Sequence, residues 1–320
     1  MASTQTTQRP IVSAITPVYN GAPWLGEALD SALAQTFQAL EVIVVNDGST
    51  DDSLAIAQER ATRSNGRIRV IDQANAGLPA ARNVAMGCAR GDYFALLDAD
   101  DTWLPRHIAS AVRAFERDPD LGLVHANIER MDEAGRALGV RARQWDQQRD
   151  AFEAIALRHE HVSCPTAVFS REAVNTVGGF DTDFTGLGCE DRDLWLRIAA
   201  RFRIAYLDHV AARYRVHATS MSSQHERMDR ARRQLIVKLA GSVRGRDLVT
   251  SMEAMVDSDI GLGFLNDGRY GKALAQQWRA LRLDPSSRVI RRRLLRALLH
   301  AGSAVPVFPA RILNRRGTST

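Results

Sequence analysis

The chain has 320 residues, and 45% of them are hydrophobic, which is enough for the core of one large domain or of two small ones. No apolar run approaches the ~18 residues that a membrane-spanning helix needs. The formal net charge is +5, and residues 286–320 contain eight arginines and no acidic residue, so the basic character is concentrated at the C-terminal end.

The N-terminal segment and the cysteines point to a cytoplasmic protein. Residues 1–10 are polar and lack the apolar block of a signal peptide, so we expect a disordered lead of ten residues. Cys88, Cys164 and Cys189 are odd in number and lack metal-type spacing. They are typical of unpaired thiols in a reducing compartment.

Apolar strands and helices alternate through the first 117 residues. Strands are expected at 11–16 (ended by Pro17), 41–45 (followed by a turn at 46–49), 67–71 and 94–97. Helices are expected at 24–33, 51–62, 78–89 and 105–117. Strands that are apolar on both faces and separated by helices predict a doubly wound α/β fold, parallel over these strands.

The second half has a different pattern. Strands are expected at 121–127, 166–170, 203–207 and 211–216, with a turn at 132–135, a helix at 190–201 and only helices from about 224 onward. We therefore divide the chain into the lead 1–10, a domain 11–222 and a helical C-terminal region 223–320.

Three carboxylates follow the buried strand at 94–97. Side chains alternate along an extended chain, so Asp98 and Asp100 point the same way. A carboxylate pair at the carboxyl end of a core strand suits a hard divalent cation. A solvated turn explains these two residues alone equally well, because Asp is common in turns.

Polar segments follow each of the first four strands, at 17–20, 46–51, 75–83 and 98–101. The carboxyl ends of parallel strands share one edge of a sheet, so these segments should converge there. Each has a simpler explanation alone: Pro17 as a strand end, Asp47 in a turn, Arg82 facing solvent. Their convergence favours a binding site.

These segments resemble, in order, the successive motifs of family-two glycosyltransferases. The matching segments are Ile15–Asn20, Val44–Asp51, Asn75–Gly77 with Ala81–Asn83, Leu96–Asp101 and Gly188–Arg197. The resemblance extends over about 11–222. It implies an inverting glycosyltransferase with the A-type fold, a Rossmann-like doubly wound mixed α/β sheet, here with a C-terminal α-helical extension.

The resemblance implies roles for five residues in binding a nucleotide-diphosphate sugar. Tyr19 and Asp47 match positions that hold the nucleobase, and Pro17 lies in the same donor-binding motif. Arg82 matches a residue close to the base and phosphates. Asp98 matches the carboxylate that contacts the ribose.

The resemblance also implies a metal ion, Mg²⁺ or Mn²⁺, bound by Asp100. Such an ion bridges the diphosphate and neutralises the charge that the leaving group gains. His217 matches a histidine that reaches the diphosphate or metal in related enzymes. A surface histidine at a strand end explains His217 equally well.

Direct displacement at the anomeric carbon also requires a base for the acceptor hydroxyl. Asp191 matches the family's base, and the adjacent Glu190 is the alternative base or an acceptor contact. The helix dipole alone also favours acids at this position. Glycines at 178, 179, 186 and 188 predict a mobile loop that lays the acid over the sugar.

Two segments of the helical region have features of their own. Residues 262–285 resemble one tetratricopeptide-like hairpin, which must bury its apolar face on the catalytic domain or on a partner. Residues 288–299 form a basic amphipathic helix that either lies on an anionic membrane or packs with a solvated basic face; apolar residues at 305–313 favour the membrane. The arginines lack interleaved aromatics, which argues against nucleic acid.

We therefore predict transfer of a sugar from a UDP- or dTDP-linked donor to a hydroxyl of a glycan or lipid-linked glycan, in cell-surface polysaccharide synthesis at the inner face of the cell membrane. One alternative is a non-catalytic nucleotide-sugar-binding or scaffolding protein. Another is a nucleotidyltransferase, which should have a glycine-rich loop with Arg or Lys after the first strand. Residues 17–23 contain neither Arg nor Lys.

Overall fold

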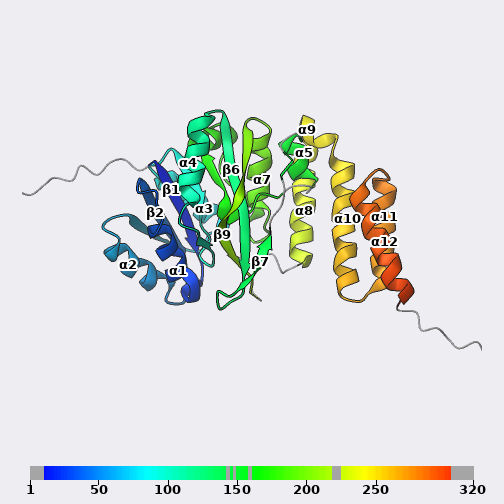
Figure 1. Ribbon diagram of the computed structural model, residues 1–320, viewed down its shortest axis with the longest axis horizontal. Helices are drawn as coiled ribbons and strands as arrows, with labels where there is room; N and C mark the ends of the chain where they lie inside the picture. The colour runs from blue at the N-terminus through cyan, green and yellow to red at the C-terminus, as the bar shows by residue number, and fades with distance from the viewer. Residues whose placement is uncertain (1–10, 142–144, 147–148, 158–160, 218–224, 304–320) are drawn as a thin grey trace, which may run out of the picture. The chain divides into compact units, whose positions relative to one another are not determined.

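The computed structural model describes residues 11–141, 145–146, 149–157, 161–217 and 225–303 (Figure 1). The expected disordered lead 1–10 and the apolar residues 305–313 lie outside them. The chain forms two compact units, residues 1–249 and 250–320. Helix α8 thus lies within the first unit, although the motifs that set the sequence boundary end near residue 222.

The first unit is built on one nine-stranded sheet in the order β3-β2-β1-β4-β8-β6-β9-β5, with β7 paired to β6. The strands are β1 Val12–Val18, β2 Leu40–Asp47, β3 Ile68–Gln73, β4 Tyr93–Leu96, β5 Thr102–Trp103, β6 Leu121–Met131, β7 Ala137–Arg141, β8 Val168–Ser170 and β9 Arg203–Arg215. Strands β1 to β4 are parallel, and β8 runs antiparallel between β4 and β6. The predicted mixed, doubly wound α/β fold is confirmed.

Helices cover both faces of this sheet. They are α1 Ala22–Leu33, α2 Ser53–Arg63, α3 Leu78–Cys88, α4 His107–Arg117, α5 Ala151–Ala156, α6 Arg171–Val177, α7 Glu190–Ala199, α8 His225–Ala240 and α9 Val243–Arg246, with short 3₁₀ turns η1 Cys164–Thr166 and η2 Thr182–Phe184. Ala95 and Leu97 share a core with α1 and α4. Phe94 instead contacts Phe169, which contacts Trp195 of α7. Burial on both faces explains the unbroken apolar runs of the strands.

The prediction that Pro17 ends the first strand is wrong. Pro17 lies within β1, in register with Val45 of β2. The carbonyl of Ile15 accepts a hydrogen bond from the Leu97 N–H on the β4 side. Alternation directs position 17 to that same side, beyond the last paired residue of β4. The N–H that proline lacks is therefore not needed by the ladder.

The predicted strands 203–207 and 211–216 form one continuous strand, β9. It runs parallel to β6, and the two lie side by side in Figure 1. Their register shifts on both sides of Asn127. Such irregularities let two strands of unequal residue count stay paired, so the polar Asp208 and His209 do not interrupt the sheet as the sequence indicated.

The second unit contains three helices, α10 Val249–Asn266, α11 Tyr270–Leu283 and α12 Arg288–Ser303. Gly268, with φ of 71°, lies in the turn between α10 and α11. One small core joins Ala254 and Met255 to Ala280 and Ile290. A second joins Leu265, Ala273 and Ala297. The helical extension predicted from the sequence is present, and none of the helices described is long and apolar enough to cross a bilayer.

Candidate active site

The polar segments that follow strands β1, β2 and β4 lie at one edge of the sheet, because these strands are parallel and in register. Tyr19 follows β1 directly and is 56% exposed. Asp98 and Asp100 follow β4. The parallel topology therefore brings together the donor-binding residues expected from the sequence.

Side-chain hydrogen bonds join the loops after β1 and β2. The Asn20 N–H donates to Ser49 Oγ (3.0 Å), and Asn20 Oδ1 accepts from the Thr50 N–H (2.8 Å). The Ala22 N–H donates to Asp51 Oδ2 (3.0 Å). Asn20 has φ of 53°, a left-handed conformation that Asn tolerates. The two loops therefore form one surface beside Tyr19.

Asp47 holds the loop between β3 and α3. It is the last residue of β2 rather than part of a turn, and its side chain is buried. Oδ1 accepts from Gln73 Nε2 (2.7 Å) and the Ala76 N–H (2.8 Å), and Oδ2 accepts from the Gly77 N–H (2.8 Å). A carboxylate can accept about four hydrogen bonds. A contact with a nucleobase would therefore come in addition to the three bonds by which Asp47 holds this loop.

Arg82 of α3 joins two parts of the site that lie far apart in the sequence. Its Nη2 donates to Asp98 Oδ1 and its Nη1 donates to Glu190 Oε1, both at 2.7 Å. The guanidinium is 2% exposed and also contacts Cys164 Sγ (3.3 Å). Burial raises the pKa of Cys164, which keeps it a neutral thiol. Arg82 thus contacts the Asp98 carboxylate directly, whereas a solvent-facing Arg82 is excluded.

Asp100 and His217 form a second pair at the same edge. Asp100 Oδ2 lies 2.9 Å from His217 Nε2, and the His217 ring lies against Trp24 with centroids 4.4 Å apart. Burial, and next the charge of Asp98, raise the pKa of Asp100. His217 is therefore not an isolated surface residue.

Arg215 at the end of β9 fixes the backbone that presents this pair. Its N–H donates to Asp101 Oδ1 (2.8 Å), and its Nε donates to the Asp100 carbonyl (2.9 Å). Its Nη2 bonds Glu27 of α1. Arg215 and Asp101 are both buried, so Asp101 supports the site from within the protein.

Asp100 and His217 suit a divalent metal ion. The pKa of the partly buried Asp100 is raised beside a second carboxylate, which is the setting that a cation stabilises. Among the residues described, no group of three His, Cys, Asp or Glu side chains could hold a metal. Mg²⁺ is commonly held by one or two carboxylates together with substrate phosphates. Asp100 supplies such a carboxylate, and His217 adds an imidazole nitrogen beside it.

The motifs and their placement agree with comparison to protein families. The model described as "Glycosyl transferase family 2" matches residues 13–178, more than half of the chain. The chain belongs to glycosyl transferase family 2. A second model, described as "N-terminal domain of galactosyltransferase", matches residues 156–219.

Curated relatives of this glycosyl transferase include an uncharacterized glycosyltransferase of Rickettsia prowazekii, 31% identical over 220 residues, which are 67% of this chain and 66% of that protein. Chondroitin synthase of Escherichia coli is 30% identical over 190 residues, 59% of this chain and 26% of the synthase. Hyaluronan synthase of Pasteurella multocida is 27% identical over 214 residues, 67% of this chain and 21% of the synthase. The chain spans less than two thirds of the length of these relatives.

Two solved structures share the fold. The mannosyltransferase PcManGT of Pyrobaculum calidifontis, in complex with GDP-Man and Mn²⁺, has a TM-score of 0.63 at 22% identity, covering 95% of this chain and 82% of that one. TarS 1–349 of S. aureus, in complex with UDP-GlcNAc, has a TM-score of 0.58 at 18% identity, covering 89% and 88%. The predicted A-type glycosyltransferase fold is confirmed.

The acidic pair of this family-two protein lies at the start of α7. Glu190 is buried and bonded to Arg82, whereas Asp191 is partly buried and accepts from the Arg192 N–H (2.7 Å). Burial raises the pKa of Asp191 and the charge of Asp98 adds to this, while Arg82 and Arg192 oppose it. The two acids are therefore held in different ways.

Several residues of the site make contacts that the sequence does not reveal. Arg215, Glu27 and Cys164 act through contacts with residues more than 80 positions away. Arginine is usually exposed, so the sequence does not indicate that Arg215 is buried, just as it does not for Arg82. Only the folded arrangement identifies these residues.

Replacing Arg82 with Met should lower the free energy of unfolding by about 3–5 kcal/mol, because it removes the ion-pair partner of the buried Glu190 and of the partly buried Asp98. The matched control is Arg136→Met, which removes an exposed pair with Asp132 and should cost less than ~1 kcal/mol. Chemical denaturation measures both values. Equal losses for the two variants would contradict the structural role of Arg82.

Proposed function

We propose that the protein is an inverting, metal-dependent glycosyltransferase that uses a UDP- or dTDP-linked sugar. The main support is the contact of Arg82 with both Asp98, the carboxylate that we expect to contact the donor, and Glu190, the neighbour of Asp191. Neighbours of the same fold were solved with UDP-GlcNAc and with GDP-Man and Mn²⁺. A donor diphosphate at the sheet edge is consistent with both.

In the proposed reaction, the acceptor oxygen attacks the anomeric carbon as the bond from that carbon to the diphosphate breaks. The proton of the acceptor hydroxyl goes to Asp191, because Glu190 is already bonded to Arg82. Asp98 and Tyr19 orient the nucleoside. When bound by Asp100 and His217, Mg²⁺ or Mn²⁺ supplies Lewis-acid neutralisation of the leaving diphosphate.

The acceptor that we propose is a hydroxyl of a glycan or lipid-linked glycan, in cell-surface polysaccharide synthesis. Chondroitin synthase and hyaluronan synthase are among the relatives, and their names describe synthesis of such polymers. A non-catalytic sugar-nucleotide-binding protein is the competing hypothesis, and loss of turnover on changing Asp191 separates the two.

Replacing Asp191 with Asn should lower kcat about 10²- to 10⁴-fold, because the acceptor proton loses its base. Asp120→Asn changes an exposed acid beyond the opposite end of the sheet and should leave kcat unchanged. Initial rates of transfer from the nucleotide sugar measure both. Equal rates for Asp191→Asn and the wild type would refute this mechanism.

The same assay has a defined pH dependence. Burial raises the pKa of Asp191, so the carboxylate forms at a higher pH than an exposed Asp side chain does. The value of kcat/KM should therefore fall as the pH drops through that raised pKa. The residual activity of Asp191→Asn should not show this fall in kcat/KM at low pH.

We further propose that α12 attaches the protein to the inner face of the cell membrane. Ile290, Leu294 and Ala297 are buried within the second unit. Leu295, Leu298 and Leu299, spaced three and four apart and so on one side of the helix, are 58%, 44% and 65% exposed. The exposed arginines at 288, 291, 292 and 296 surround them. Packing within the unit thus buries only some of the apolar residues of α12. The three exposed leucines can insert into a membrane surface while the arginines pair with anionic headgroups.

The protein should sediment with vesicles of phosphatidylglycerol and phosphatidylcholine, but not with phosphatidylcholine alone. Added salt should weaken this binding, because it screens the arginines. Replacing all three exposed leucines with Gln should abolish it, whereas Leu138→Gln, at an exposed residue of β7, should not. Binding that the triple replacement leaves intact would overturn the membrane proposal.

A further inference from the structure

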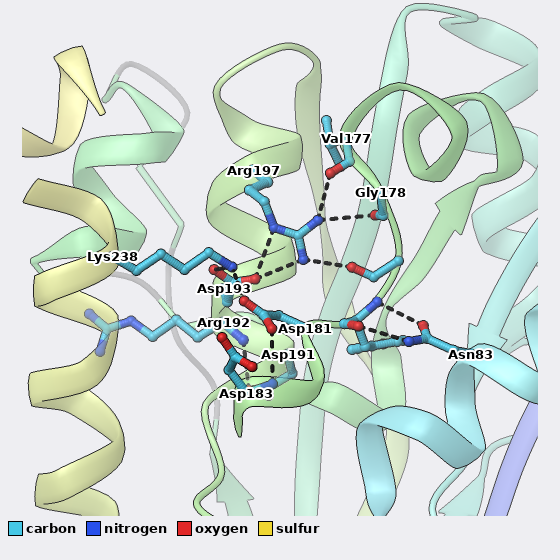
Figure 2. Close-up of polar contacts among 12 residues, drawn as sticks. Asn83, Val177, Gly178, Asp181, Asp183, Asp191, Arg192, Asp193, Arg197 and Lys238 are labelled. Atoms are coloured by element: carbon cyan, nitrogen blue, oxygen red, sulfur yellow. Dashed lines mark hydrogen bonds and ion pairs between the residues drawn. The ribbon is translucent and has the colours of Figure 1, made fainter. Parts of the chain in front are cut away.

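Helix α8 contacts the segment that leads into the start of α7. Lys238 Nζ lies 2.7 Å from Asp193 Oδ1 and also pairs with Asp181 Oδ2. Gln234 Nε2 donates to the Asp183 carbonyl (2.8 Å). Figure 2 shows Lys238 reaching from α8 toward Asp193 of α7.

Asp193 is a buried carboxylate, 1% exposed, two residues beyond Asp191. Its Oδ2 accepts from Arg197 Nε (2.9 Å) and pairs with Arg197 Nη2 (2.7 Å), and its Oδ1 faces Lys238. A buried charge is tolerated only when it is paired. Arg197 and Lys238 together supply that pairing, one from within α7 and one from α8.

Arg197 and Asn83 extend the network to the loop before η2. Arg197 donates to the carbonyls of Val177 (2.8 Å), Gly178 (3.0 Å) and Gly179 (2.7 Å). Asn83 of α3 donates to the Phe180 carbonyl and accepts from the Phe180 N–H, each at 2.8 Å (Figure 2). The loop is thereby held between α3 and α7 as far as residue 180.

The residues that follow, 181–190, pack against α8. Gly186 and Gly188 have φ of 73° and 97°, and Cys189, with φ of 68°, is left-handed directly before Glu190. A Cβ added to Gly188 would lie 3.2 Å from Met228 Sδ of α8, so α8 is packed closely over this turn. The direction in which α7 begins is therefore set by a segment that α8 contacts.

The choice of lysine fits this geometry. The chain has 42 basic residues, and only two of them, Lys238 and Lys272, are lysines. A compact ammonium with three rotatable donors can pair with carboxylates on two segments, here Asp181 and Asp193. Lys272 of α11 provides a matched control in the other unit.

We propose that Lys238 is a positioning residue, which holds residues 181–190 and Asp193 so that Asp191 faces the acceptor hydroxyl. Helix α8 lies beyond the residues 13–178 and 156–219 that the two family models match. The function proposed for Asp191 is the basis of this inference. The proposal thus assigns a role to a contact made by α8, a helix outside the segments that the family models match.

The test compares Lys238→Met, Lys238→Arg and Lys272→Met in the full chain. Lys238→Met should lower kcat about 10- to 100-fold through misplacement of the base, with the donor KM unchanged. Lys238→Arg should recover part of the loss because it keeps the charge, and Lys272→Met should match the wild type. Hydrogen–deuterium exchange without ligand should increase in peptides spanning 181–190 of Lys238→Met alone.

A wild-type kcat for Lys238→Met, or unchanged exchange in residues 181–190, would overturn the inference. A fall in kcat matched by an equal rise in donor KM would also overturn it, because that places part of the defect in the donor site. If the wild-type protein itself neither binds nor transfers a sugar nucleotide, the proposed function fails, and the exchange measurement still decides whether Lys238 holds the segment.

Discussion

The site depends on the contact of one buried guanidinium with two carboxylates. Arg82 bonds Asp98 and Glu190 at 2.7 Å each, in a position that water barely reaches. Glu190 is buried and would be costly to leave unpaired, and the two contacts together connect the end of β4 to the start of α7. Two segments that carry the candidate site are therefore held in a fixed relation by the protein's own contacts, which is the kind of preorganisation that positions reactants.

This contact also separates the roles of the two adjacent acids. Glu190 is bonded to Arg82, so its carboxylate supports the architecture of the site. Asp191 instead accepts a hydrogen bond from the Arg192 N–H; burial raises the pKa of both acids, so the difference between them lies in their hydrogen-bond partners. On the opposite side of the site, Arg215 performs a comparable structural function for the backbone of Asp100.

The fold was largely predictable from the sequence because its first half has strong local signals. Strands β1 to β4 are unbroken apolar runs, and α1 and α4 repeat apolar residues at helical spacing. Helices α5 and α9 have six and four residues, too few for that periodicity to appear. Pro17 was misjudged because a strand tolerates proline only where pairing on one side has ended, which is a property of the sheet.

The sequence predicts a set of site residues but not the contacts between them. The order of the motifs predicts Asp98, Asp100 and Asp191 in one site, and the parallel strands place Asp98 and Asp100 at the edge of the sheet that this prediction requires. The partners of Arg82 and Arg215 lie up to 188 positions away, and no local pattern encodes such pairs. The same holds for Lys238, whose helix lies outside the motifs.

The most direct test is calorimetric titration of UDP-, dTDP- and GDP-linked sugars into the wild type, Asp100→Asn and Asp191→Asn, with and without Mn²⁺. A metal-dependent donor site separate from the base predicts that one nucleotide class binds the wild type only with metal. Asp100→Asn should weaken that binding about 10- to 100-fold, and Asp191→Asn should retain it. Binding that needs no metal and is equally strong in Asp100→Asn would contradict the account.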